Sequence, residues 1–97
     1  MEMMIGVMKP QLYLYGVTSL KQKRSIVKSL IGRLQSRFNI SISEVDRNDS
    51  KSSAVIGIAI VSNDAAFIDR QLDKIIDFMR ADTRFTLGPI ERETFSS

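Results

Sequence analysis

The chain has 97 residues, 43% of them hydrophobic and 26% charged, with a formal net charge of +3, which is ordinary for one globular domain. It contains no histidine and no cysteine, which excludes a Ser-His-Asp triad, a thiolate nucleophile, a disulfide framework and the usual zinc sites. No apolar run approaches the roughly 20 residues that span a bilayer and no signal-peptide pattern is present, so we expect a cytoplasmic, non-enzymatic protein without a cofactor or membrane partner.

Residues 5–15 are rich in β-forming side chains and predict the first strand. Met8, Leu12 and Leu14 share one face of this strand, because successive side chains point to opposite sides. Pro10 has no N–H group to offer a neighbouring strand, so we expect a bulge or an unpaired stretch beside it.

The first helix begins where Ser19 and Gln22 have the spacing of a capping box. Its apolar stripe consists of Leu20, Val27, Leu30, Ile31, Leu34 and Phe38. The same segment has no acid, and its six cations are Lys21, Lys23, Arg24, Lys28, Arg33 and Arg37. The first turn holds three of them, although the helix dipole disfavours positive charge there. Lys23 lies on the apolar side, so we expect its ammonium to emerge at the helix tip.

The remaining sequence predicts a strand at residues 39–45, a mobile polar loop at 46–53, a strand at 54–62, a helix ending near 80 and a short final strand at 84–95. The third strand is apolar on both faces. The segment "SND" at 62–64 is the expected cap of the second helix, with Ser62 or Asn63 as the capping residue. The charge of this helical segment is only −1. We expect the final strand to be interrupted at Gly88 and Pro89.

The order β-α-β-β-α-β over residues 1–97 predicts a single ferredoxin-like domain of the α+β class, with two helices on one face of a four-stranded antiparallel sheet. Right-handed crossovers place the first and third strands at its centre. The second apolar face of the third strand then needs a cover, either the final strand or another subunit.

Three segments resemble the YlxP-like family of small bacterial proteins of unknown function: "SLKQKR" at 19–24, "RFNISISEVD" at 37–46 and "GIAIVSND" at 57–64. The closing "IERE" is also similar. This resemblance implies a ferredoxin-like fold. The family's genes tend to sit beside translation-initiation and ribosome-maturation genes, so it also implies an association with RNA or the ribosome. At residues 50–53 the chain departs from the family, where many relatives carry Trp with Gln or Arg, and it lacks a proline common after the first strand.

The basic first helix is the candidate site. Free amides at a helix start attract anions, and cations along several turns suit a phosphate backbone. We therefore predict phosphate or RNA binding by Lys21, Lys23, Arg24, Lys28, Arg33 and Arg37. The alternative is a solvated helix whose acidic partners come from elsewhere in the fold. Recognition of RNA bases by stacking on the sheet face is disfavoured, because Tyr13 and Tyr15 have no aromatic counterpart on the third strand.

Other functions remain open. A homo-oligomeric interaction module would use the apolar sheet face with Phe67 and Phe78, unless these rings pack within the chain. An enzyme or binder acting on a small phosphorylated ligand would need a carboxylate near the helix tip. Glu44, Asp46 and Asp49 match no ion-binding loop, so we predict no metal site.

Overall fold

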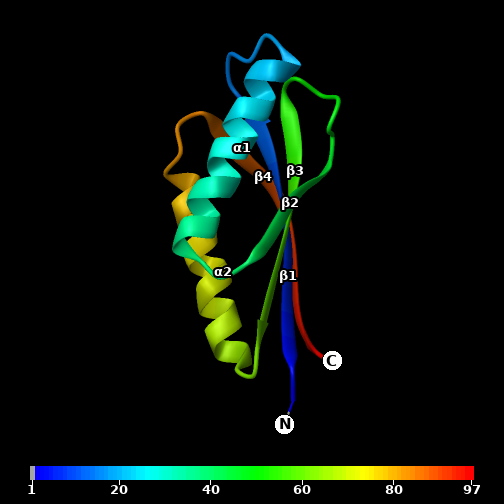
Figure 1. Cartoon of the computed structure of the whole chain (residues 1–97), viewed down its shortest axis with the longest axis vertical. Coiled ribbons are helices and arrows are strands. Elements are labelled where there is room, and N and C mark those ends of the chain that lie inside the picture. Colours follow the sequence, from blue (N-terminus) through cyan, green and yellow to red (C-terminus); the bar gives the residue numbers. More distant parts are fainter. Residues whose placement is uncertain (1) are drawn as a thin grey trace.

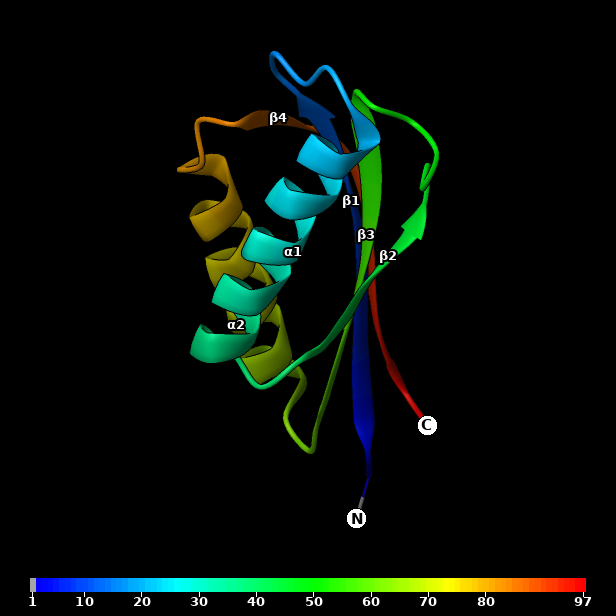
Figure 2. The ribbon, with the colours of Figure 1, turned by 45° about the horizontal axis from the view of Figure 1, so that its top comes forward.

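The computed structural model describes residues 2–97 and shows the predicted ferredoxin-like fold. Its elements are β1 (Met4–Leu14), α1 (Leu20–Arg37), β2 (Ser41–Asp46), β3 (Ser53–Ser62), α2 (Ala65–Arg80) and β4 (Phe85–Ser96). The strands form one antiparallel sheet in the order β2-β3-β1-β4, so β1 and β3 are central as predicted. Both helices cover the same face of the sheet (Figure 1, Figure 2). Within residues 2–97, no helix is long and apolar enough to cross a membrane.

The start of α1 is capped as predicted by Ser19, whose Oγ accepts a hydrogen bond from the Gln22 amide at 3.1 Å. The return bond goes one residue earlier than in the usual capping box, because Gln22 Oε1 accepts from the amide of Thr18 at 3.0 Å. The Ser19 side chain thus satisfies a donor that the first helical turn leaves free, and the Gln22 side chain satisfies one in the preceding loop. They hold the end of the β1–α1 loop in place.

The cap of α2 lies in the predicted segment 62–64, but the capping residue is Asp64, so the choice of Ser62 or Asn63 was wrong. Asp64 Oδ1 accepts from the amides of Ala66 at 3.0 Å and Phe67 at 3.2 Å. Ser62 instead uses its Oγ to accept from the Asp64 amide at 3.2 Å. A carboxylate at this position also complements the positive end of the helix dipole.

The pairing of β1 with β4 shifts register between Pro10 and Leu12, which confirms the irregularity expected beside the proline. β4 has 12 residues, the same length as the predicted segment, and continues through Gly88 and Pro89. These two residues lie at the register shift, between the pairs Leu12–Leu87 and Pro10–Ile90, so the expected interruption takes the form of a bulge within a continuous strand. A Cβ at Gly88 would lie 2.4 Å from Cε2 of Tyr13, so this ring rests on the glycine. The final strand therefore forms an edge of the sheet and does not fold across it.

The hydrophobic core fills the space between the sheet and the two helices. Its buried helical side chains are Val27, Leu30 and Leu34 of α1 and Ile68, Leu72, Ile75, Ile76 and Met79 of α2. Helix α2 approaches β1 most tightly at Gly6, where a Cβ would lie 2.2 Å from Cγ2 of Ile68. Any larger residue there would push the helix off the sheet.

The opposite face of the sheet has no cover among residues 2–97 (Figure 2). Val61 of β3 is 63% exposed, Val45 of β2 is 53% exposed and Phe95 of β4 is 37% exposed. Of the two covers expected for this face, the final strand is excluded by its place in the sheet. The other, a second subunit, stays a prediction.

Candidate functional site

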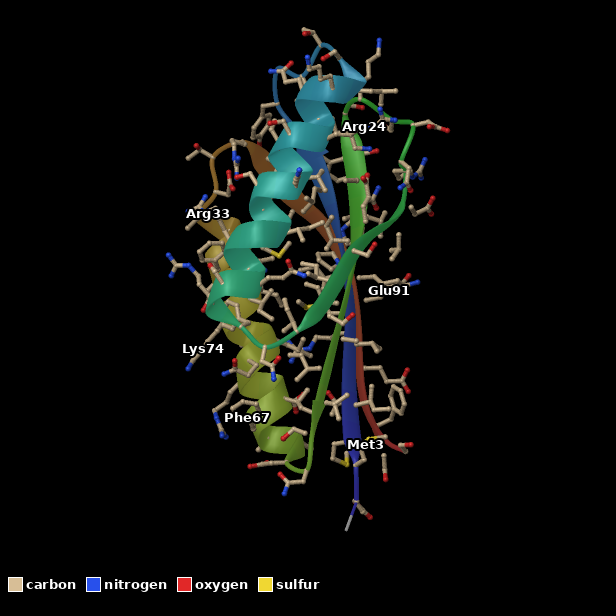
Figure 3. All side chains as sticks on the ribbon, in the orientation of Figure 1. Met3, Arg24, Arg33, Phe67, Lys74 and Glu91 are labelled. Carbon is tan, nitrogen blue, oxygen red and sulfur yellow. The ribbon has the colours of Figure 1, made fainter. Side chains whose placement is uncertain are left out.

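The exposed cations of α1 lie on two edges of the helix. Lys21, Arg24 and Lys28 form one edge, called here the N-terminal edge, and Arg33 with Arg37 forms the C-terminal edge. At 100° per residue the two sets point roughly 170° apart around the helix axis. Figure 3 shows Arg24 and Arg33 projecting to opposite sides of α1. The outward face between these edges is therefore bordered by positive charge on both sides.

Lys23 does not belong to either edge, and the expectation that its ammonium emerges at the helix tip was wrong. Its side chain is fully buried. The Nζ atom lies 2.9 Å from Oε2 of Glu44 on β2 and donates a hydrogen bond to the carbonyl oxygen of Arg47. Lys23 is therefore a structural link between the start of α1 and the end of β2. It is withdrawn from any ligand that contacts the surface.

The β2–β3 loop presents the carbonyl that Lys23 contacts. Arg47 has φ of 63°, a left-handed conformation that is uncommon for a residue with a side chain. Its amide donates to Oδ1 of Asp46 at 2.7 Å, and its carbonyl also accepts from the Ser50 amide at 3.0 Å. This turn aims the carbonyl oxygen of Arg47 at the buried ammonium.

The carboxylates near the start of α1 are already engaged. Glu44 Oε2 is buried and receives no ordinary hydrogen bond within residues 2–97, so the charge of Lys23 is its compensation. Asp46 accepts from a backbone amide. Across the described part of the chain, no three acidic side chains gather where a metal ion would be held. The two carboxylates thus serve the fold at this end of the helix, Glu44 by pairing with Lys23 and Asp46 by binding the Arg47 amide.

Phe78 on α2 is half-buried and packs against the core. The guanidinium carbons of Arg37 and Arg33 lie 4.6 Å and 5.2 Å from the centre of its ring, within the range of cation–π attraction. The ring is thus used inside the chain. Phe67 is 39% exposed and lies three turns away, about 16 Å along α2. The structure does not bring the two aromatic residues into one patch.

Arg84 adds a sixth accessible cation, which the sequence reasoning missed. It follows α2 in the chain, and its Nη2 lies 2.6 Å from Oδ2 of Asp82 while its Nε donates to Oδ1 at 3.0 Å. These hydrogen bonds from Arg84 lower the pKa of Asp82, and the charge of Arg33 lowers it further. An Asp and an Arg two residues apart are common in loops, so no local signal marked them.

The acids of neighbouring elements do not neutralise the two edges. Asp69 and Asp73 of α2 lie 3.6 Å and 2.7 Å from Arg92 of β4. Thr94 Oγ1 also donates to Asp69 at 2.9 Å. Within residues 2–97, Lys23 is the one cation of α1 that has an ion-pair partner. The alternative of a basic helix neutralised from elsewhere in the fold holds only for Lys23.

The sequence matches the model of a family described as "Protein of unknown function (DUF503)" over residues 5–92. It is 34% identical over 76 residues to "Uncharacterized protein YlxP" from Bacillus subtilis (strain 168), which covers 78% of this chain and 83% of that protein. These matches confirm the resemblance seen in the sequence. The de novo designed protein Foldit4 has the same fold, with a TM-score of 0.61, 14% identity and 99% of each chain covered.

Proposed function

The chain belongs to the DUF503 family of proteins of unknown function, and from its geometry we propose that it binds RNA through phosphate groups, using the exposed cations of α1. The N-terminal edge and the C-terminal edge together contribute Lys21, Arg24, Lys28, Arg33 and Arg37. Lys23, which the sequence included in this set, is left out because it is buried. An association with the ribosome is the setting that the family's gene neighbourhoods imply.

The observation that carries this proposal is that the five exposed cations on the two edges of α1 have no ion-pair partner in residues 2–97. Their positive charges repel one another, and those in the first turn also oppose the helix dipole. Such an arrangement destabilises the isolated protein slightly and is relieved by a bound polyanion. The 18 residues of α1 extend about 27 Å, long enough to follow several phosphates.

The open sheet face does not offer the usual alternative for RNA. Base recognition on a sheet needs aromatic side chains on its central strands. On the open face of β3 the residues are small or aliphatic, namely Val55, Gly57, Ala59 and Val61. Tyr13 on β1 is 44% exposed but its ring lies on Gly88 at the edge strand. The chemistry therefore favours backbone recognition by α1.

The test is RNA binding measured across a salt series. Each phosphate neutralised on single-stranded RNA contributes about −0.7 to the slope of log K against log salt. The variant Lys21→Gln/Arg24→Gln/Lys28→Gln is expected to flatten that slope by up to about 2. The matched control Arg70→Gln/Lys74→Gln/Arg80→Gln removes the same charge from α2. Equal losses in both variants, or no binding by the folded wild type at low salt, would refute recognition by α1.

A second candidate function, a homo-oligomeric interaction module, is favoured by the uncovered apolar sheet face. Exposed aliphatic surface of this kind is typical of a surface that packs against another protein. The variant Val61→Lys places a charge on this face near the end of β3, whereas Phe67→Lys changes an exposed aromatic residue on α2. Light scattering is expected to show an oligomer that Val61→Lys dissociates and Phe67→Lys leaves intact. A monomeric wild type at high concentration would exclude this function.

A further inference from the structure

A cavity of about 280 Å³ opens where the end of α2, the loop after it and the C-terminal edge of α1 meet. It is lined by Arg33, Phe78, Ala81, Asp82, Thr83 and Arg84. In Figure 1 the α2–β4 connection lies beside α1 at this level. The site thus combines α1 with the end of α2 and the loop that follows it, two parts of the sequence that are far apart in the chain.

The Asp82 carboxylate fixes the position of the Arg84 guanidinium in this cavity. The Asp82 side chain is only 6% exposed and binds the Nε and Nη2 atoms of the guanidinium. The remaining nitrogen, Nη1, makes a single long contact of 3.4 Å with Oγ of Ser29 on α1. Both side chains line the cavity, and the negative charge of Asp82 is compensated by the guanidinium that it binds. Asp82 is a positioning residue, and the Nη1 edge of Arg84 is free for a ligand.

The other guanidinium groups are held by an aromatic ring. Arg33 lines the cavity, and both Arg33 and Arg37 lie over Phe78. A stacked guanidinium has its direction restricted but keeps its N–H groups available for an anion. The charged residues of the lining, Arg33, Arg84 and Asp82, carry a formal charge of +1, and Arg37 adds a further positive charge on the Phe78 ring. Thr83 adds a hydroxyl to the lining.

We propose that this cavity binds one phosphate group of the RNA chain, held by the guanidinium groups of Arg33 and Arg84. The identity of the ligand as RNA rests on the proposed function. Planar forks of N–H donors match the oxygens of a phosphate, which is why arginine is preferred at such sites. The cavity is just smaller than the roughly 300 Å³ at which sites for small organic ligands begin. It therefore suits a phosphate with part of its nucleotide.

The first test uses inorganic phosphate as the probe and follows the Nε–Hε signals of the arginines by NMR. The signals of Arg33 and Arg84 are expected to shift and saturate, while that of Arg70 on α2 stays unchanged. An absence of any saturable shift at Arg33 and Arg84 would overturn the site.

The second test compares 5′-phosphorylated and 5′-hydroxyl RNA of one sequence with wild type, Arg84→Lys and Arg33→Gln. Arg84→Lys keeps a cation beside Asp82 but loses the fork. Since hydrogen bonds to charged groups are worth a factor of roughly 10 or more, each variant is expected to bind about 10-fold more weakly. The matched control Lys28→Gln on the N-terminal edge removes one charge and is expected to lose less. A loss confined to the phosphorylated RNA identifies an end phosphate, and a loss with both RNAs identifies an internal one.

Failure of the inference and failure of the proposed function give different results. If Arg84→Lys binds both RNAs as well as wild type while the N-terminal edge variant loses binding, the pocket is refuted and RNA binding by α1 stands. If phosphate shifts the arginine signals but neither RNA binds, RNA is refuted as the source of the phosphate.

Discussion

The buried ion pair between Lys23 and Glu44 gives the sharpest test of how α1 is anchored. Replacing Lys23 by Met removes the ammonium and leaves the Glu44 carboxylate buried, with its side chain 14% exposed and no other compensation within the described residues. Removing one partner of a buried pair destabilises a protein by roughly 3–5 kcal/mol. We take the lower figure, about 3 kcal/mol, because Glu44 keeps some contact with water and Arg47 keeps its bond from Ser50.

The double variant Lys23→Met/Glu44→Leu separates the charge effect from packing. With both charges gone, apolar side chains of similar volume fill the site, and such replacements are often neutral or stabilising. We expect the double variant to recover most of the stability that the single variant loses. Urea unfolding with a constant m-value measures both free energies of unfolding. In a domain of this size, a loss of about 3 kcal/mol corresponds to a fall in Tm of about 12–24 °C.

The reasoning is refuted if Lys23→Met costs less than about 1 kcal/mol, or if the double variant is as unstable as the single one. Either result would mean that Glu44 is well solvated without its partner. The prediction also affects the RNA experiments. A variant that includes Lys23 would lose binding by unfolding, so Lys23 must stay intact when the surface of α1 is tested.

Two further predictions concern packing and pH. Gly6→Ala is expected to destabilise the fold by roughly 1–3 kcal/mol, since its Cβ would collide with Ile68. Gly32→Ala has open space around it on α1 and should stabilise the fold by about 0.8–1 kcal/mol. Thermal melts compare the two variants, and equal effects would contradict the close approach of α2 to Gly6. Arg84 lowers the pKa of Asp82 below 3.8 in the folded chain, so this pair contributes stability above that pH and loses it as pH falls through the lowered pKa. Asp82→Asn is expected to be less stable than wild type near neutral pH and to lose less stability as the pH falls, as measured by the midpoints of urea unfolding. If the variant and wild type lose the same stability in acid, Asp82 does not contribute to the acid dependence.

The two segments that most strongly suggested a family turn out to touch each other. Lys23 belongs to "SLKQKR" and Glu44 to "RFNISISEVD", and the fold joins them in one buried ion pair. Part of the basic motif is therefore structural, and only Lys21 and Arg24 of that segment remain for a ligand. A motif read as a set of surface charges thus contains both an anchor and a contact surface.

The sequence by itself determined the order of elements, the cap at Ser19 and the irregularity beside Pro10, because each depends on neighbours a few residues away in the chain. Alternation with a period of two and stripes with a period near 3.6 are local properties as well. Only the tertiary structure decided which charges stay exposed. Lys23 meets Glu44, and Arg84 meets Ser29 of α1, through contacts that depend on how the helices cross the sheet. Whether a charged side chain is buried depends on the residues that the fold places opposite it. A helical wheel describes a single helix and says nothing of residues from other elements.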